Sequence, residues 1–311
     1  MRNSFVNRLY ELAKEDKDII LLTADLGYGV LSNFYDNLKK QFINVGIAEQ
    51  NMASIAASFG LDGKKPYIYS IGNFTSLRCL EQIRNDILYH NSNVKIISVG
   101  SGFGYGQLGM SHHATEDMAI MRALPNIIIF TPSDKIEAEQ IADLTLTTNK
   151  PAYIRLSKGN EPVIHNKKIK VKIGKAIEVM KGQDVVIFVA GSASTEAYEA
   201  CKKLNKKSVS TGLYSFPTIK PIDKKLIKKV FNTSKVVLTV EDNNMIGGLY
   251  SAVSEVVATE NHKALFKGIG LNDEYTSIVG SQNYLRKVYK INKDEIVKQA
   301  LKLLNKIERN K

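Results

Sequence analysis

The chain has 311 residues, 44% of them apolar, which is typical of two domains that each bury a hydrophobic core. Its net charge of +12 comes from scattered lysines with no motif that interleaves basic and aromatic residues, so solubility or attraction of anionic substrates is favoured over nucleic-acid binding. No apolar run approaches the ~18 residues of a membrane span and no signal-peptide core follows the first residues, so we expect a cytoplasmic protein without membrane contact.

Short apolar runs alternate with amphipathic stretches along the first half of the chain. Helices with one buried face are predicted around residues 5–13 and 48–59, where apolar residues recur at helical spacing. Pro132-Ser133-Asp134 followed by Glu137 is typical of a capped helix start. The continuous apolar runs predict buried strands of a parallel sheet at residues 19–22, 94–99 and 127–130. We therefore expect a first domain over residues 1–160.

A polar, lysine-rich segment interrupts this alternation, and we interpret residues 161–172 as an interdomain linker. A second alternation predicts another domain over residues 173–311. Its predicted strands are residues 185–190, 207–213 and 236–240, and its predicted helices are residues 195–204, 249–258 and 294–307. Cys79 and Cys201 lie far apart in helix-like patterns, which indicates neither a disulfide framework nor a metal site. The predicted fold class is α/β, with two domains that are each a mostly parallel sheet flanked by helices.

The sharpest local signal is an acidic residue at the junction between a strand end and an apolar-faced helix. Glu49 is predicted in the first helical turn, where a carboxylate complements the helix dipole, and that is its ordinary structural interpretation. Its neighbours in the sequence are apolar or small, namely Val45, Ile47, Ala48 and Met52. Such surroundings push a carboxylate towards its protonated form, as an acid–base catalyst needs. Glu49 is therefore a candidate catalytic residue.

The peptide Gly46-Ile47-Ala48-Glu49-Gln50-Asn51 resembles the motif of the transketolase pyrimidine-binding domain. The resemblance covers nearly the whole chain, because further family-like peptides follow in the family's order. In the first half they are Glu81-Gln82-Ile83-Arg84, Gly109-Met110-Ser111-His112, Glu116-Asp117, Pro125-Asn126 and Pro132-Ser133-Asp134. In the second half, Thr239-Val240-Glu241-Asp242 and Ile246-Gly247-Gly248-Leu249 resemble the family's C-terminal domain. An ordered set of this kind is far more specific than any single match.

The resemblance implies thiamine diphosphate as the cofactor, which supplies the chemistry that moves a two-carbon ketol unit from a ketose to an aldehyde. Glu49 would hydrogen-bond a nitrogen of the aminopyrimidine ring and share its proton. Asp25 and Phe74 match cofactor-contacting positions, and an ordinary core phenylalanine is the alternative interpretation of Phe74. Ile71 stands where the family usually has a stacking phenylalanine. The chain is thus expected to act as a transketolase-like transferase.

The resemblance also implies substrate-binding residues. His112 matches the family histidine that hydrogen-bonds substrate oxygens, and His113 either shares that role or faces solvent. The family's serine, histidine, acidic residue and arginine at four further positions are replaced here by Gly29, Gly100, Leu108 and Lys158. Lysine lacks the bidentate fork that suits phosphate, and the other changes predict a roomier, less polar mouth. We therefore expect a modified, deoxygenated or carrier-linked sugar as substrate, with Lys158 contacting a distant anion.

Part of the family's cofactor site is missing from the sequence. The family holds the diphosphate through Mg²⁺ with a Gly-Asp-Gly motif and a later asparagine, whereas Leu61-Asp62-Gly63-Lys64 is only a turn. Gly104-Tyr105-Gly106-Gln107-Leu108-Gly109 spells a dinucleotide fingerprint, but no helix opens within it, so we interpret it as a flexible loop. The resemblance therefore implies an N-terminal partner subunit that holds Mg²⁺, in a two-fold heterotetramer with sites at the subunit contacts.

Two alternatives stay open. A deoxyxylulose-phosphate synthase-like or 2-oxo-acid dehydrogenase beta-like subunit would share the glutamate and decarboxylate a 2-oxo acid. Ser111-His112 followed by Glu116-Asp117 favours transketolase over these two. A non-catalytic assembly or regulatory subunit would keep the fold without the chemistry. The presence of Glu49 argues against that alternative, and Ile71 argues for it.

Overall fold

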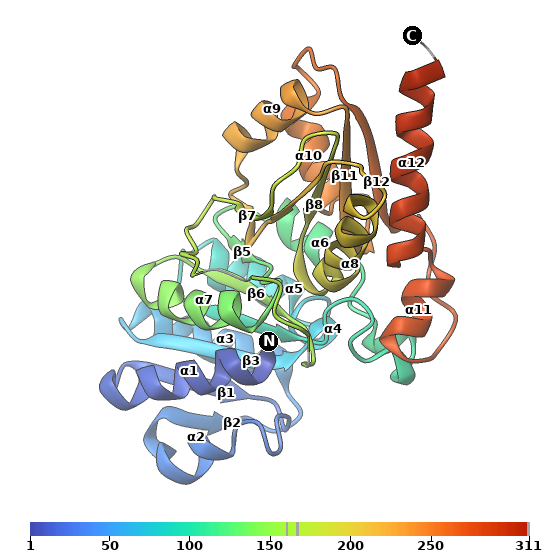
Figure 1. Cartoon of the computed structure of the whole chain (residues 1–311). Helices are drawn as coiled ribbons and strands as arrows, with labels where there is room; N and C mark the ends of the chain where they lie inside the picture. The colour runs from blue at the N-terminus through green and yellow to red at the C-terminus, as the bar shows by residue number, and fades with distance from the viewer. Residues whose placement is uncertain (160, 166–167, 310–311) are drawn as a thin grey trace.

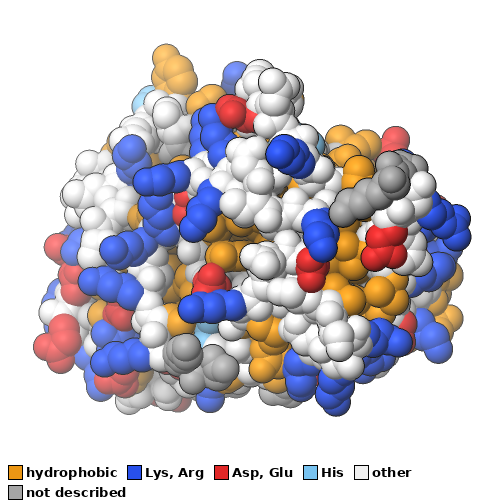
Figure 2. Space-filling model, turned by 45° about the horizontal axis from the view of Figure 1, so that its top comes forward, with side chains coloured by type: hydrophobic (Ala, Val, Ile, Leu, Met, Phe, Trp, Pro, Cys, Tyr) orange, Lys and Arg blue, Asp and Glu red, His pale blue; other side chains and the backbone are white. Residues whose placement is uncertain are grey.

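A computed structural model of the chain describes residues 1–159, 161–165 and 168–309. Two mostly parallel sheets, each flanked by helices, form the molecule (Figure 1), which confirms the predicted α/β class. No helix within these described residues is both long and apolar enough to cross a membrane. Lysine and arginine side chains are spread among acidic and apolar ones over the face shown in Figure 2 rather than gathered in a single patch.

The first sheet has seven strands in the order β10-β5-β6-β4-β3-β1-β2. All neighbouring strands are parallel except β10 and β5. Strands β1, β4 and β6 are buried at every residue because helices cover both faces of the sheet. The strands from the first half of the chain are β1 (Ile19–Thr23), β2 (Phe42–Asn44), β3 (Lys65–Ile71), β4 (Lys95–Val99), β5 (Ile128–Phe130) and β6 (Ala152–Leu156). The predicted strands at residues 19–22, 94–99 and 127–130 are confirmed.

Helices α1 (Arg2–Glu15) and α7 (Lys135–Thr147) cover one face of the first sheet, and α3 (Glu49–Leu61) covers the other. Each helix buries the apolar stripe that its sequence spacing predicts, such as Phe5 and Leu9 of α1. The shorter elements are α2 (Ser32–Asn37), α4 (Gly72–Thr75), α5 (Leu80–Gln82), α6 (Asp117–Ala123), a π-helical turn (Ile83–Leu88) and 3₁₀ turns (Lys39–Gln41, Gly106–Leu108 and Met110–His112).

The second sheet has five strands in the order β12-β11-β8-β9-β7, and only β7 is antiparallel to its neighbour. Its strands are β7 (Ile177–Met180), β8 (Val185–Val189), β9 (Thr211–Ser215), β11 (Val236–Asn244) and β12 (Leu265–Leu271), and the helices are α8 (Ser194–Asn205), α9 (Lys224–Thr233), α10 (Leu249–Val257), α11 (Gln282–Val288) and α12 (Lys293–Arg309). The predicted strand at residues 207–213 is wrong at its start. A turn with Ser208 at φ 62° follows α8, and the Asn205 side chain fixes it by accepting from the Thr211 N–H at 2.9 Å.

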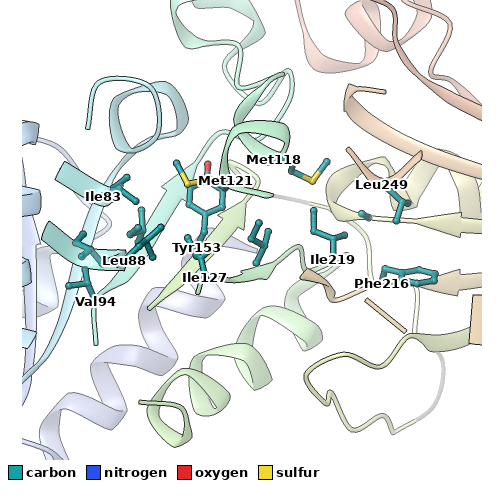
Figure 3. Packing of buried hydrophobic residues seen from close by; sticks show 14 of the residues in the cluster. Ile83, Leu88, Val94, Met118, Met121, Ile127, Tyr153, Phe216, Ile219 and Leu249 are labelled. Atoms are coloured by element: carbon teal, nitrogen blue, oxygen red, sulfur yellow. The ribbon is translucent and has the colours of Figure 1, made fainter. Parts of the chain in front are cut away.

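The two halves of the chain share a sheet and a core. Strand β10 (Thr218–Lys220), from the second half, pairs antiparallel with β5 and so completes the first sheet. One apolar cluster runs across the same junction, from Met118 and Tyr153 on one side to Ile219 and Leu249 on the other (Figure 3). The domains are therefore packed together as well as linked by the chain.

The predicted linker lies along the start of α7. Asp134 caps this helix as predicted, because its Oδ1 accepts from the Ile136 N–H at 2.9 Å. Its other oxygen accepts from the N–H of Ile164 in the linker at 3.1 Å. Nε2 of His165 lies 2.7 Å from Oε1 of Glu137. Burial lowers the pKa of His165, but the hydrogen bond and charge of Glu137 outweigh that effect, so the pKa is raised. Residues 160, 166 and 167 lie outside the described residues.

A buried ion network joins the two domains. Arg155, the fourth residue of β6, places Nε 2.9 Å from Asp117 Oδ2 and Nη1 3.0 Å from Asp242 Oδ1, and all three side chains are inaccessible to solvent. Asp242 belongs to β11 and also accepts from Arg286 of α11 at 3.2 Å. Burial works against the charge of Asp242, but Arg155 and Arg286 outweigh it and hold its pKa at about 2. Asp117 is thus paired within the first domain, and Asp242 is paired with Arg155 across the domain junction.

Replacing Arg155 with methionine removes the cation while keeping an unbranched side chain. Buried Asp117 then loses its guanidinium partner, and Asp242 keeps only Arg286, which together costs roughly 3–5 kcal/mol of unfolding free energy. Urea denaturation measures this loss. The matched control is Arg8→Met, because Arg8 pairs with Asp143 at 2.6 Å on the surface. Loss of that exposed pair costs about 0–1 kcal/mol. Equal losses in the two variants would show that the buried network does not hold the domains.

The raised pKa of His165 gives folding a defined pH dependence. Its pair with Glu137 contributes stability that is fully present below the ordinary pKa of 6.5 and is lost as the pH rises through the higher folded value. The melting temperature of the native chain should therefore exceed that of His165→Gln most at about pH 6. This difference should shrink as the pH rises. His90→Gln, at an exposed position, is the control and should show no trend. A difference in melting temperature that grows with pH would contradict the pairing of His165 with Glu137.

Candidate functional site

The parallel strands of the first sheet end at one edge, and the candidate residues lie in the segments that follow these ends. Asp25 follows β1, Glu49 follows β2, Phe74 follows β3, His112 follows β4 and Lys158 follows β6. This edge is where α/β proteins bind their ligands. The topology therefore gathers residues that are far apart in the sequence.

Glu49 is the first residue of α3, and its side chain is only 4% exposed. Its Oε1 accepts from Nη1 of Arg78 at 2.7 Å, and among the described residues this is the carboxylate's sole hydrogen bond. The sequence predicted apolar or small surroundings, and that prediction is wrong in two respects. A guanidinium contacts the carboxylate, and Ile47 of the motif is 81% exposed instead of packed beside it.

Arg78 and Phe74 form the next contacts along the edge. The guanidinium carbon of Arg78 lies 4.1 Å from the ring centroid of Phe74. The same phenylalanine ring meets the imidazole of His112 edge-on, with centroids 5.3 Å apart. Phe74 is half-buried, so it is not an ordinary core residue. Arg78 was not predicted from the sequence, although its spacing of four from Phe74 is a signal for contact within one helical turn.

His112 ends a 3₁₀ turn on the loop after β4. Asn73 holds this loop by donating from Nδ2 to the carbonyls of Ser111 and His113, both at 3.0 Å. Oγ of Ser111 lies 3.0 Å from Nδ1 of His112, and no partner for Nε2 occurs in the described part of the chain. Burial and then the nearby His113 lower the pKa of His112. The imidazole is therefore neutral at neutral pH, with Nε2 available to a ligand.

His113 does not face solvent, which corrects one of its two predicted roles. It is only 1% exposed, its Nδ1 lies 2.7 Å from Oγ1 of Thr276, and its Nε2 lies 3.0 Å from the carbonyl of Gly106. Both ring nitrogens are thus occupied within the chain. His113 positions the loop that carries His112, and of the two histidines only His112 presents a nitrogen to the site.

Tyr105 continues the contacts from His112 to Lys158. Its ring lies 6.3 Å from the imidazole of His112 and 4.9 Å from Nζ of Lys158. Gly100, at φ 92°, makes room for this ring, because a Cβ on Gly100 would lie 2.1 Å from Cδ2 of Tyr105. The predicted roomier mouth is therefore wrong at Gly100, where Tyr105 fills the space. Tyr105 was not predicted as a site residue, because its stretch of sequence indicated only a flexible loop.

A cavity of about 500 Å³ lies beside Gly104 and Lys158. Arg2 at the start of α1 and Lys135 at the start of α7 also line it, together with Glu161, whose carboxylate lies 3.2 Å from the Met1 ammonium. The cations outnumber this one acid, which suits an anionic group. We call this cavity the cationic pocket. Arg2 and Lys135 were not predicted from the sequence because neither belongs to a motif that signals ligand binding.

Asp25 and Ile71 lie at the ends of β1 and β3, at the same edge of the sheet as Glu49. Asp25 has φ 54°, donates its N–H to Oδ1 of Asn44 at 3.0 Å, and accepts from the Tyr28 hydroxyl at 2.8 Å. Asn44 is the last residue of β2, just before the Glu49 motif. Ile71 is the half-buried last residue of β3.

Residues 1–163 match the family model of the transketolase pyrimidine-binding domain, and residues 174–296 match that of the transketolase C-terminal domain. The chain belongs to the transketolase family. Over 98% of its length it is 34% identical to 97% of an apulose-4-phosphate transketolase subunit of Phocaeicola vulgatus. It is 30% identical to a 6-deoxy-6-sulfo-D-fructose transketolase subunit of Clostridium sp. strain MSTE9, over 96% of this chain and 93% of that one. A solved split-gene transketolase, an inactive beta4 tetramer, matches with a TM-score of 0.89 at 32% identity over 98% of both chains.

Membership in the transketolase family implies dependence on thiamine diphosphate. The site fits the pyrimidine half of this cofactor. Glu49 is a buried carboxylate whose one hydrogen-bond partner among the described residues is the half-exposed Arg78 side chain, and Phe74 offers an aromatic face beside it. The described residues contain no group of three or more His, Cys, Asp or Glu side chains arranged to hold a metal ion. The residues around Glu49 therefore fit the pyrimidine part of the cofactor.

Proposed function

We propose that this chain is the pyrimidine-binding subunit of a two-chain, thiamine-diphosphate-dependent transketolase that transfers a two-carbon ketol unit from a ketose to an aldehyde. The observation that carries the proposal is a continuous row of contacts at the carboxyl edge of the first sheet. This row, the edge row, consists of Glu49, Arg78, Phe74, His112, Tyr105 and Lys158. It runs from a buried carboxylate to the cationic pocket, as a site for a cofactor ring and an anionic sugar requires.

Thiamine diphosphate supplies the nucleophilic carbon of this reaction when it is bound. In the proposed mechanism Glu49 holds a nitrogen of the aminopyrimidine ring and exchanges a proton with it. Phe74 excludes water from this exchange, and Asp25 and Ile71 line the same part of the cofactor site. Nε2 of His112 hydrogen-bonds the substrate oxygens near the reacting carbons, because its neutral imidazole donates or accepts without a charge.

The remaining cofactor contacts belong to the partner in this proposal. An N-terminal subunit with a Gly-Asp-Gly motif would hold Mg²⁺ and the diphosphate, and two copies of each chain would form a heterotetramer. The nearly full-length matches to relatives named as transketolase subunits and to a chain of a split-gene transketolase tetramer support this assembly.

The cationic pocket favours a sugar with an anionic group far from its reacting carbons. Lys158, Arg2 and Lys135 line the pocket, and Tyr105 lies between Lys158 and His112. The two relatives reported above are named for apulose-4-phosphate and 6-deoxy-6-sulfo-D-fructose, each of which carries an anionic group. We therefore propose a modified, anionic sugar as substrate. The transketolase names of these relatives also favour ketol transfer over decarboxylation of a 2-oxo acid, and the buried Glu49 favours catalysis over a purely structural subunit.

Glu49→Gln tests the catalytic assignment, because it keeps the side-chain volume and hence the packing almost unchanged. In the complex with the diphosphate-binding partner, turnover should fall by ~100-fold or more through loss of a positioned proton-transfer group, while the melting temperature changes little. Steady-state kinetics and thermal melting provide the two measurements. Glu11→Gln, at an exposed position on α1, is the control and should keep native turnover. Near-native turnover of Glu49→Gln would remove Glu49 from the mechanism.

Lys158→Met tests the substrate class. Loss of one charge-assisted contact should raise the KM for an anionic sugar by roughly 10- to 100-fold, with little change in kcat. The KM for an uncharged analogue should stay unchanged. Lys17→Met changes the net charge equally, but it precedes β1 and so lies at the opposite edge of the sheet. Equal effects of the two variants, or a preference of the native complex for ordinary pentose phosphates, would contradict the proposed modified-sugar specificity.

A further inference from the structure

Arg78 makes two contacts that the proposed function assigns to the aminopyrimidine ring. Its Nη1 donates to Glu49 Oε1 at 2.7 Å, and its guanidinium carbon lies 4.1 Å from the Phe74 ring centroid. A guanidinium is planar, carries N–H donors at its edge and stacks on aromatic faces. An aminopyrimidine ring shares these three properties. We infer that Arg78 is a placeholder that occupies the aminopyrimidine position in the cofactor-free subunit and is displaced when the cofactor binds.

The exposures of the two partners show which of them moves. The Glu49 side chain is 4% exposed and the Arg78 side chain is 44% exposed. Glu49 is also fixed in place as the first residue of α3. Close to Glu49 lies Cys79, whose thiol is buried; this burial and then the Glu49 charge raise the pKa of Cys79 to about 12. The open approach to the carboxylate is therefore on the Arg78 side, and the guanidinium is the group with room to swing outward.

The placeholder has a physical advantage for a subunit that does not carry the whole cofactor site. A buried carboxylate without a partner is costly, and Arg78 supplies that partner until the cofactor arrives. Within the described chain, the guanidinium of Arg78 donates to Glu49 alone. Its departure therefore breaks one ion pair and one cation–π contact, both of which are weak at a partly exposed site.

The inference rests on the proposed function and is tested on the complex of this chain with its diphosphate-binding partner. Calorimetry would measure the binding of thiamine diphosphate with Mg²⁺ to the native, Arg78→Ala and Arg84→Ala complexes. Arg84 is the matched control, because it is exposed and bonds only its neighbour Asn85, at 2.7 Å, among the described residues. Arg78→Ala should bind the cofactor roughly tenfold more tightly, since it has no competing contacts to break. Arg84→Ala should bind like the native complex.

Thermal melting provides a second measurement that does not depend on activity. Arg78→Ala should lower the melting temperature of the cofactor-free complex but not that of the cofactor-bound complex, so the rise caused by the cofactor becomes larger. Arg78→Lys keeps the charge but loses the planar fork, and its affinity should lie between those of the native and alanine forms.

Two outcomes would contradict the placeholder. If Arg78→Ala binds the cofactor more weakly than the native complex, Arg78 is a permanent orienting partner of Glu49. If Arg78→Ala and Arg84→Ala bind the cofactor equally well, the contacts of Arg78 have no role in cofactor binding. Either result overturns the placeholder. Failure of the proposed function gives a different pattern, because Glu49→Gln would then leave both cofactor affinity and turnover unchanged.

Discussion

The buried guanidinium of Arg155 fixes the relation between the two domains and the base of the candidate site. It pairs with Asp117 of the first domain and Asp242 of the second, and it donates to the Ala114 carbonyl at 2.8 Å. Gly102 approaches Asp242 so closely that a Cβ would lie 2.5 Å from its Cγ. The loop that carries His112 is therefore anchored at both ends to this network. An unpaired buried charge costs so much free energy that the network allows very few arrangements of the two domains. Its main effect is therefore to specify how the domains pack.

The edge row depends on that anchored loop and on the parallel order of the strands. Its side chains come from the four segments that follow β2, β3, β4 and β6, and each contacts the next. Two residues outside the row hold this loop in place. Asn73 donates to the carbonyls on either side of His112, and His113 bonds Gly106 of the same loop and Thr276 of the second domain. A rigid frame of this kind keeps a neutral imidazole and a buried carboxylate in fixed positions without help from a ligand.

At the end of the edge row next to the cationic pocket, a glycine makes room for an aromatic ring. Gly100 lacks the side chain that would collide with Tyr105, and the tyrosine ring lies in that space with Lys158 above it. An aromatic surface next to cations therefore lies at this end of the row. Arg2 and Lys135, each at the beginning of a long helix, complete the cationic pocket. The three cations of the pocket come from three separate segments of the chain. They can act together on one ligand because the fold brings these segments side by side.

The sequence by itself determined the features that rest on local chemistry: the α/β class, most strands and helices, the cap at Asp134 and the helix that begins at the Glu49 motif. Apolar runs and helical spacing report burial directly, and a cap or motif lies within a few residues. Only the tertiary structure decided that β10 completes the first sheet, that Arg155 is buried against two carboxylates, that Arg78 contacts Glu49, and that Tyr105 fills the space at Gly100. A short edge strand and a charge within a strand have no periodic signature, and contacts between distant loops are set by which strand ends meet at one edge. The cationic pocket belongs to this second group, since Arg2, Lys135 and Lys158 become neighbours only when α1, α7 and β6 pack together.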